Sequence, residues 1–272
     1  MANWFITGIS RGFGRIMAEE LLAQGHTVIG TTRDGRAPIL HDRLTVFKLD
    51  VRDADQARAV LEEAVASTGG IDVLVNNAGY GLVGAVEEVS PAEAEAVIAT
   101  NLIGTHNVIR AALPSMRAQR RGHIVNFSSV GGFAGSVGFG LYNASKFAVE
   151  GLSEALALEL KPFGIGVTIV EPGYFRTEFL SADSAVKAAH SIEAYAQSAG
   201  QTRSNVSAHD GSQAGDPAKG VRAIIAAVES PEPPLRLPLG ADCIARMEAK
   251  IAQLQADIAT WRDVATATAF DS

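Results

Sequence analysis

The chain is predicted to form an α/β fold, with a doubly wound, mainly parallel sheet of seven strands and helices on both faces. Short apolar runs alternate with longer amphipathic runs, which is typical of strand–helix–strand units with right-handed crossovers. The short runs are nearly continuous in apolar character, as expected of strands covered on both faces. They comprise residues 3–7, 27–31, 44–49, 71–76, 123–127, 166–170 and 235–239.

The predicted helices lie between and after these strands. Apolar residues recur with helical spacing at residues 16–24, 54–67, 91–116 and 142–160. A further helix begins at Asp216 and Pro217, which suit an N-cap and a first helical position, and it runs to about residue 229. An amphipathic helix over residues 241–264 follows, and its apolar spacing favours packing onto the domain over binding a partner.

One segment breaks the regular alternation. Residues 181–199 are rich in alanine and are predicted to be helical, whereas residues 200–215 are dense in glycine and polar residues and show no periodicity. The second stretch is therefore expected to be mobile. We interpret residues 1–272 as a single domain, in which residues 178–215 form a variable lid over the substrate and residues 241–265 form an extra C-terminal helix.

Composition and charge argue against several classes of protein. A net charge of −7 does not suit a nucleic-acid-binding protein, which needs a basic surface. No apolar stretch approaches the ~20 residues needed to span a membrane, and the first residues lead into a strand rather than a signal peptide. A single cysteine, Cys243, fits a reducing compartment, so a soluble, cytoplasmic protein is expected. The six histidines are scattered, and no metal site is predicted.

A glycine-rich turn follows the first predicted strand and leads directly into a helix. It reads Thr-Gly-x-x-x-Gly-x-Gly, with Gly8, Gly12 and Gly14 at the glycine positions and Ser10, Arg11 and Phe13 between them. Backbone N–H groups at a helix N-terminus bind phosphate, and only a turn without side chains lets a pyrophosphate approach them closely. The turn alone is a weak signal, but its place in a strand–helix–strand unit favours a dinucleotide site.

Several further motifs occur in a fixed order along the chain. They are Asp50 after the third strand, Asn76-Asn77-Ala78-Gly79 after the fourth, Asn101 in a long helix, Ser129 after the fifth strand, Tyr142-x-x-x-Lys146, and Pro172-Gly173 with Thr177 after the sixth. With the glycine turn they cover residues 1–180, and the pattern resembles the single-domain short-chain dehydrogenase/reductase family. The resemblance implies a Rossmann-like fold and a nicotinamide dinucleotide cofactor. It also implies a homodimer built on the helices at residues 91–116 and 142–160, while the extra C-terminal helix argues against the family's common tetramer.

The candidate catalytic group can be argued from its chemistry. On a helix, Tyr142 and Lys146 lie one turn apart on the same face. A phenol is a poor base at neutral pH, and a nearby ammonium is expected to lower the pKa of Tyr142 toward the working range. Ser129 suits a hydrogen-bond donor to the developing oxyanion of a carbonyl, with Ser128 the bystander. The resemblance adds Asn101 as the residue that holds a water linking Lys146 to solvent.

The resemblance also assigns the residues that bind the rest of the cofactor. Asn77, Ala78 and Gly79 form a turn against which an adenosine ribose can lie. Asp50 accepts a hydrogen bond from the adenine amino group, and Val51 packs on the adenine ring. Pro172 and Gly173 bend the chain at the carboxyl end of the sheet, and Thr177 binds the nicotinamide carboxamide.

The choice between NADP(H) and NAD(H) depends on the end of the second strand. An acidic residue there would bind the ribose hydroxyls and repel a 2′-phosphate. The position is held by Thr32 and then Arg33, and Arg11 lies on the same side, so two guanidinium groups could bind a phosphate. A small shift in register would instead bring in Asp34. NADP(H) is therefore expected, with NAD(H) as the alternative.

Together these features predict an oxidoreductase that moves a hydride between NADP(H) and the ketone or secondary alcohol carbon of a small substrate. The apolar residues Phe175, Phe179, Leu180 and Tyr195 either line an apolar substrate pocket or form the core of the lid. Two alternatives stay open: a regulatory protein that senses NADP(H) without chemistry, and an NAD-dependent dehydrogenase or epimerase of the same fold. The first has little need for a Ser-Tyr-Lys group. Sugar-nucleotide epimerases that use the same group usually carry a larger C-terminal domain, for which 272 residues leave little room.

Overall fold

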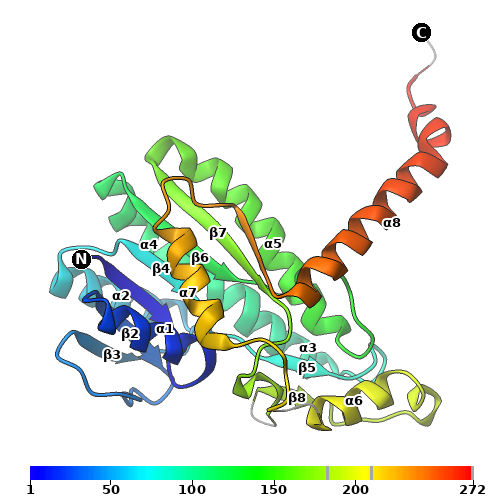
Figure 1. Ribbon diagram of the computed structural model, residues 1–272, viewed down its shortest axis with the longest axis horizontal. Helices are drawn as coiled ribbons and strands as arrows, with labels where there is room; N and C mark the ends of the chain where they lie inside the picture. The colour runs from blue at the N-terminus through cyan, green and yellow to red at the C-terminus, as the bar shows by residue number, and fades with distance from the viewer. Residues whose placement is uncertain (182–183, 209–210, 271–272) are drawn as a thin grey trace.

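The computed structural model describes residues 1–181, 184–208 and 211–270, and it confirms the predicted fold class (Figure 1). Seven strands form one sheet in the order β3-β2-β1-β4-β6-β7-β9, and every neighbouring pair is parallel. The strands are β1 (Asn3–Thr7), β2 (Thr27–Thr32), β3 (Leu44–Lys48), β4 (Val73–Asn76), β6 (Gly122–Phe127), β7 (Ile165–Pro172) and β9 (Arg236–Leu239).

Helices cover both faces of the sheet because alternate strand residues are buried on opposite sides. Trp4 and Val28 pack with α1 (Gly12–Ala23) and α7 (Pro217–Val228). Their neighbours Phe5 and Ile29 pack on the other face, against the three helices α2 (Ala54–Thr68), α4 (Gly104–Gln119) and α5 (Gly140–Leu160). The two apolar clusters form the core and hold the strand ends rigidly in place.

The predicted helix at residues 91–116 is a composite of three pieces. It consists of α3 (Pro91–Ile98), a π-helical turn (Ala99–Ile103) and α4, which ends at Gln119. Ser90 caps its start through a reciprocal pair of hydrogen bonds with Glu93. A π turn inserts one residue into the helical repeat and so changes the direction of the side chains within it. The residue at its centre is Asn101.

The segment after β7 differs from the sequence prediction. The described part of residues 181–199 does not form the predicted helix. It contains β8 (Ala185–Lys187), which pairs with β5 (Gly81–Val83), and a 3-10 turn (Glu193–Tyr195). Alanine-rich composition favours a helix only weakly, and pairing with β5 outweighs it here. Helix α6 (Ala199–Ala208) instead lies in the stretch expected to be mobile. Residues 182–183 and 209–210 of these two predictions lie outside the described residues. The remaining short 3-10 turns are Val130–Gly132, Lys161–Phe163 and Glu178–Leu180.

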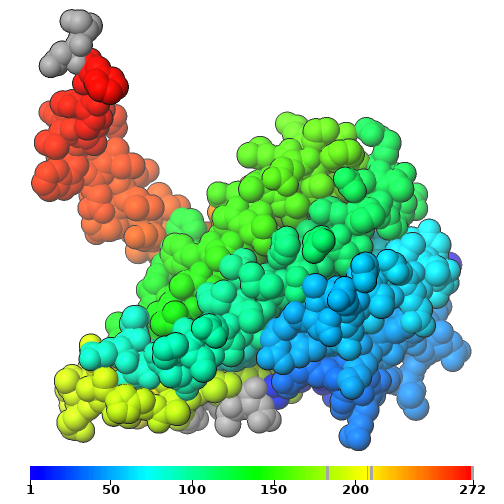
Figure 2. All heavy atoms as spheres, turned by 180° about the vertical axis from the view of Figure 1, so that it is seen from behind, coloured from blue at the N-terminus to red at the C-terminus, as the bar shows by residue number. Residues whose placement is uncertain are grey.

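Helix α8 (Ala241–Thr266) projects from the body of the molecule (Figures 1 and 2). Its buried residues are Cys243 and Met247, in its first two turns. Residues 251–270 are all exposed, so the expectation that this helix packs onto the domain is wrong beyond its beginning. Over the described residues, no helix combines the length and the apolar character needed to cross a bilayer.

Candidate active site

A cavity of about 700 Å³ lies at the carboxyl ends of the central strands, where the strand order reverses between β1 and β4. Open α/β sheets bind their ligands at this place. The structure brings together on its walls all but two of the predicted site residues; the exceptions, Gly14 and Asn101, pack behind residues that line it. The predicted residues on the walls are Gly8, Ser10, Arg11, Gly12, Phe13, Arg33, Asp50, Val51, Asn77, Ala78, Gly79, Ser129, Tyr142, Lys146, Pro172, Gly173 and Thr177.

The glycine-rich turn has a shape that side chains would disturb. Gly8 and Gly12 have φ angles of 75° and 58°, in the left-handed region that favours glycine. A Cβ on Gly14 would lie 2.3 Å from the carbonyl oxygen of Gly8 and 2.5 Å from Nδ2 of Asn77. Asn77 holds the turn in place, because its Nδ2 donates hydrogen bonds to the carbonyl oxygens of Thr7 and Gly8 at 3.0 and 2.9 Å.

An anionic group already lies at this turn. The backbone N–H of Gly12, at the N-terminus of α1, donates a hydrogen bond of 3.1 Å to a carboxylate oxygen of Glu178. The partial positive charge of a helix N-terminus favours an anion there, and a phosphate would use the same donor. Sequence reasoning missed Glu178, because nothing in the spacing of the motifs brings a residue beside Thr177 to the first glycine turn.

The two candidate acidic residues after β2 and β3 differ in whether they line the cavity. Asp34 does not line the cavity: its carboxylate accepts hydrogen bonds from Thr32 Oγ1 and from the N–H of Arg36, both at 3.1 Å. Arg33 does line it. Asp50 also lines the cavity, and Arg52, which the sequence analysis did not select, binds its carboxylate with Nε at 2.9 Å. This pairing with Arg52 is the main reason why the pKa of Asp50 lies below its ordinary value.

Tyr142 is buried at the inner end of the same cavity. Burial raises the pKa of its phenol to about 12, although a hydrogen bond with Ser129 opposes the shift. The prediction that Lys146 lowers this pKa is wrong in its net direction, because desolvation of the buried phenol dominates. The Ser129 hydroxyl oxygen also accepts a hydrogen bond of 3.0 Å from the N–H of Gly131, which fixes its position beside Tyr142. Ser128 lies against Gly132 instead.

Lys146 is the cation of the site. Its Nζ lies 5.9 Å from the centre of the Tyr142 ring and donates a hydrogen bond of 2.7 Å to the carbonyl oxygen of Phe127. Burial lowers the pKa of Lys146 to about 8, while the carboxylate of Glu150, one turn further along α5, opposes the shift. At neutral pH the side chain is therefore mostly a buried ammonium next to a protonated phenol.

Asn101 acts on the site from behind its wall. Its Oδ1 accepts from the N–H of Tyr80 at 3.0 Å, and its Nδ2 donates to Tyr80 O at 2.9 Å and to Ser145 Oγ at 3.0 Å. These bonds join the loop after β4 to the helix that carries Tyr142. A Cβ on Gly79 would lie 3.0 Å from Oδ1 of Asn101, so a side chain here would displace the amide of Asn101 slightly. The water-holding role implied by the resemblance stays a prediction.

The loop after β7 forms one wall of the cavity. A Cβ on Gly173 would lie 2.3 Å from a carboxylate oxygen of Asp242, which itself accepts a hydrogen bond from the N–H of Tyr174. The loop therefore has to pass close to the start of α8. Thr177 lines the cavity, and its hydroxyl oxygen accepts from the N–H of Phe179 at 3.3 Å.

Apolar side chains surround Tyr142 in the cavity. Phe139 and Phe179 pack on the Tyr142 ring, with ring centres 6.0 and 5.8 Å away. Phe175, Phe179 and Leu180 line the cavity, the first of the two alternatives left open by the sequence. Leu180 also packs in an apolar cluster with Val83, Ala185 and Val206. Tyr195 does not line the cavity: its hydroxyl donates a hydrogen bond of 2.7 Å to Glu87 on the exposed surface.

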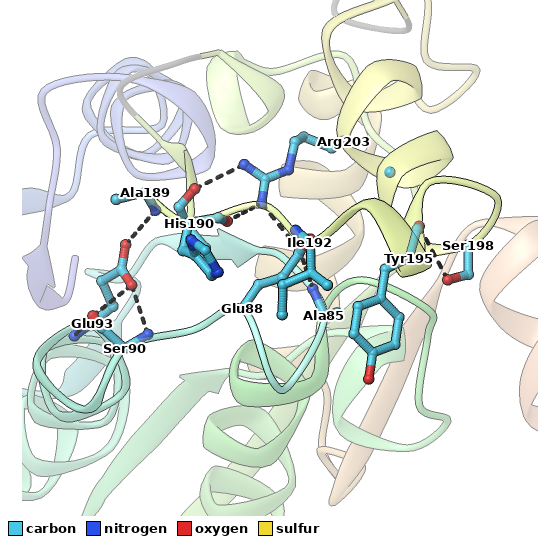
Figure 3. A network of polar contacts seen from close by, with 12 residues as sticks. Ala85, Glu88, Ser90, Glu93, Ala189, His190, Ile192, Tyr195, Ser198 and Arg203 are labelled. Carbon is cyan, nitrogen blue, oxygen red and sulfur yellow. Dashed lines mark hydrogen bonds and ion pairs between the residues drawn. The ribbon is translucent and has the colours of Figure 1, made fainter.

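A partly buried ion pair joins helix α6 to the segment between β5 and α3 (Figure 3). Arg203 of α6 donates to a carboxylate oxygen of Glu88 at 3.1 Å and to the carbonyl oxygens of Ala188 and His190. Glu88 also accepts from the N–H groups of Ala85 and Ile192, and these backbone bonds hold its pKa below the ordinary value. Arg203 thus joins α6 both to Glu88 and to the segment after β8, and the role of residues 178–215 as a lid stays a prediction.

The family model for short chain dehydrogenase matches residues 3–188. The chain belongs to the short-chain dehydrogenase family.

Among the described residues, no group of three histidine, cysteine or acidic side chains is placed to hold a metal ion.

Relatives and solved structures of the family agree with this assignment. The chain is 48% identical over 174 residues to a 3-ketodihydrosphingosine reductase of Bacteroides thetaiotaomicron, and the alignment spans 64% of each chain. A short-chain dehydrogenase from Streptomyces avermitilis has a similar structure, with a TM-score of 0.91, 41% identity and 99% of both chains covered.

Dinucleotides are bound in other structures of similar fold. ElxO with NADP bound has a TM-score of 0.73 and 27% identity, and the match covers 90% of this chain and 100% of that one. A short-chain dehydrogenase/reductase from Burkholderia phymatum in complex with NAD has a TM-score of 0.78 and 25% identity, covering 93% and 95%. The chain is therefore an oxidoreductase of a family whose members bind NADP or NAD.

Proposed function

We propose that this short-chain dehydrogenase interconverts a ketone and a secondary alcohol on a small, mainly apolar substrate, with NADP(H) as the cofactor. The observation that carries the proposal is the cluster of Ser129, Tyr142 and Lys146 inside the cavity that begins at the glycine-rich turn. A protein that only senses the dinucleotide does not require a phenol and an ammonium buried together beside a hydroxyl group.

The cavity fits a dinucleotide along its length. The turn at Gly8, Gly12 and Gly14 offers space that a Cβ would fill and a backbone donor that already binds a carboxylate. Asp50 and Val51 would hold the adenine end, and Thr177 would bind the carboxamide of the nicotinamide ring. The bound cofactor would supply the hydride in the reductive direction and accept it in the oxidative one.

The protein's own residues would move the proton. With a pKa of about 12, Tyr142 is protonated at neutral pH and is ready to donate its proton to the oxygen of a reduced carbonyl. Ser129 would donate a hydrogen bond to the same oxygen and orient it. The Lys146 ammonium would stabilise the phenolate left behind, which it can do strongly because the site is desolvated. This protonation state favours carbonyl reduction at neutral pH.

NADP(H) is favoured over NAD(H) by the surroundings of the second strand. Arg33, Arg11 and Arg52 line the cavity there, while the carboxylate of Asp34 bonds to Thr32 and Arg36 instead. Guanidinium groups bind a phosphate with charge-assisted hydrogen bonds, and no carboxylate at this position repels it.

Exposed apolar side chains support a proposed homodimer, and the single cysteine supports a proposed location. Exposed apolar side chains Ile103, Phe147 and Leu158 lie on the composite helix and on α5, the elements expected to form a homodimer. Light scattering at micromolar concentration should then give at least twice the monomer mass. The single, free cysteine fits a cytoplasmic protein. We expect its partner to be a small-molecule substrate, and not a nucleic acid or a membrane.

Substitution of the phenol tests the chemical step. Tyr142→Phe should lose at least about a hundredfold in turnover, because general acid–base groups contribute 10²–10⁴-fold. Its affinity for NADPH should stay within a few-fold of wild type. The measurement is a screen of apolar ketones followed at 340 nm, beside a fluorescence titration of NADPH. A variant that turns over nearly as fast as wild type would refute the mechanism. A wild-type protein that binds NADPH but reduces no ketone would favour the regulatory alternative.

A further inference from the structure

The projecting part of α8 carries an apolar stripe with no partner within the described chain. Ile251, Leu254, Ile258 and Trp261 are 44%, 43%, 57% and 62% exposed, in a stretch where every residue is exposed. An isolated helix of about 16 residues is only marginally stable in water. A helix that keeps four large apolar side chains on one face usually buries them against another surface.

The spacing of the stripe is that of a coiled coil. Apolar residues alternate at intervals of three and four from the beginning of α8 to near its end, at Ile244, Met247, Ile251, Leu254, Ile258 and Trp261. Such a heptad pattern forms the seam between two helices. Met247 packs on the domain, in a cluster with Val130 and Cys243. The same face then continues beyond the edge of the domain without cover (Figure 2).

We propose that this stripe is an interface between two copies of the chain, in which the α8 helices pack against each other in antiparallel orientation. A parallel pair is excluded by geometry. The seam face of α8 is the face that lies on its own domain at Met247, so a parallel partner would bring a second domain into the same space. An antiparallel partner places the two domains at opposite ends of the helix pair.

The length of α8 selects the register of the pair. The helix ends at Thr266 and leaves the domain near Arg246, which donates a hydrogen bond to Ala134 O. If the overlap of the two antiparallel helices has its midpoint at Ala256, the end of each helix lies beside the point where the other helix leaves its domain. In this register Ile251 faces the partner's Trp261, and Leu254 faces the partner's Ile258, each contact occurring twice.

The charges beside the seam fit this register. Glu248 comes to lie next to the partner's Arg262, so the two-fold symmetry creates two ion pairs at the rim. Asp257 of each copy approaches the symmetry axis, where the two carboxylates repel each other. This single repulsive contact predicts that Asp257→Asn tightens the association.

Sedimentation velocity tests the interface. Ile258→Glu buries two charges in the seam and should raise the dissociation constant at least tenfold, which halves the mass at low micromolar concentration. Ala256→Glu, on the opposite face of the same helix, is the matched control and should leave the mass unchanged. If the composite helix and α5 form a second interface, the wild-type assembly is larger than a dimer. Ile258→Glu then removes only the α8 interface and still halves the mass. A wild-type monomer at 100 µM, or a mass that Ile258→Glu does not change, would overturn the proposal.

Chemical crosslinking tests the register without relying on a destabilised variant. Gln255 lies beside the symmetry axis, so Gln255→Cys should be joined to its copy by a short bismaleimide. Ala256→Cys should not react in this way, because it points away from the partner. The native Cys243 is fully buried and provides little background. Equal crosslinking of the two variants would overturn the antiparallel arrangement.

Discussion

Replacing Glu178 by glutamine should tighten the binding of both dinucleotides. The Glu178 carboxylate accepts a hydrogen bond from the N–H of Gly12, and a pyrophosphate would use the same donor. The cofactor therefore has to displace this carboxylate, and bound phosphates would be repelled by it. Glutamine keeps the size of the side chain and removes its charge.

The magnitude follows from the exposure of the contact. A hydrogen bond to a charged group contributes ~1.5–3 kcal/mol when it is buried. This one is exposed, and charge interactions at such positions contribute ~0.2–1 kcal/mol. Adding a comparable repulsion between Glu178 and the phosphates gives a total of about 1 kcal/mol, or roughly a fivefold lower Kd.

The assay is a fluorescence titration with NADPH and NADH, at low salt and at 0.5 M salt. Because the pyrophosphate is common to both cofactors, Glu178→Gln should lower both Kd values by the same factor, and salt should reduce the gain. Glu193→Gln, an exposed substitution outside the cavity, is the control and should change neither value. An unchanged or higher Kd for Glu178→Gln would refute the idea that this carboxylate competes with the cofactor.

Three further predictions concern specificity and stability. Arg33→Asp should shift the NADPH/NADH preference at least tenfold, about 1.4 kcal/mol, and an unchanged ratio of the two Kd values would remove the assignment of NADP(H). The pKa of Lys146 is about 8 in the folded chain and 10.5 in the unfolded chain. Between pH 8 and pH 10.5 the unfolded chain therefore binds more protons, and this residue makes the free energy of unfolding rise with pH. The free energy of unfolding in urea should therefore be higher at pH 10 than at pH 7. Lys146→Met should reduce this difference by on the order of 2–3 kcal/mol, and the exposed Lys161→Met should leave it intact. Gly14→Ala sets a Cβ 2.3 Å from a backbone oxygen of the turn and should cost at least about 2 kcal/mol in urea unfolding, whereas Gly151→Ala, with open space in α5, should stabilise by about 0.5–1 kcal/mol; equal effects would contradict the packing argument.

Local patterns determined most of what could be predicted. The five central strands β2, β1, β4, β6 and β7 are nearly continuous apolar runs and are mostly buried, so their identity does not depend on detailed contacts. Gly8, Gly12 and Gly14 follow one of these runs directly, and Tyr142 and Lys146 share a helix face by spacing alone. For this reason the sequence predicts the glycine turn and the catalytic group, and the structure places their residues around one cavity.

Tertiary contacts decided the features that these patterns missed. The three-residue strands β5 and β8 form only because chain segments about a hundred residues apart meet, and pairing outweighs the helical preference of the alanine-rich stretch. The contact of Glu178 with Gly12 joins residues 166 positions apart, and no spacing rule connects them. Desolvation of Tyr142 reverses the direction predicted for its pKa, because burial depends on what packs around the ring rather than on the residues beside it in sequence. The amphipathic pattern of α8 predicts an apolar face, and only the position of the domain edge determines that this face is left exposed.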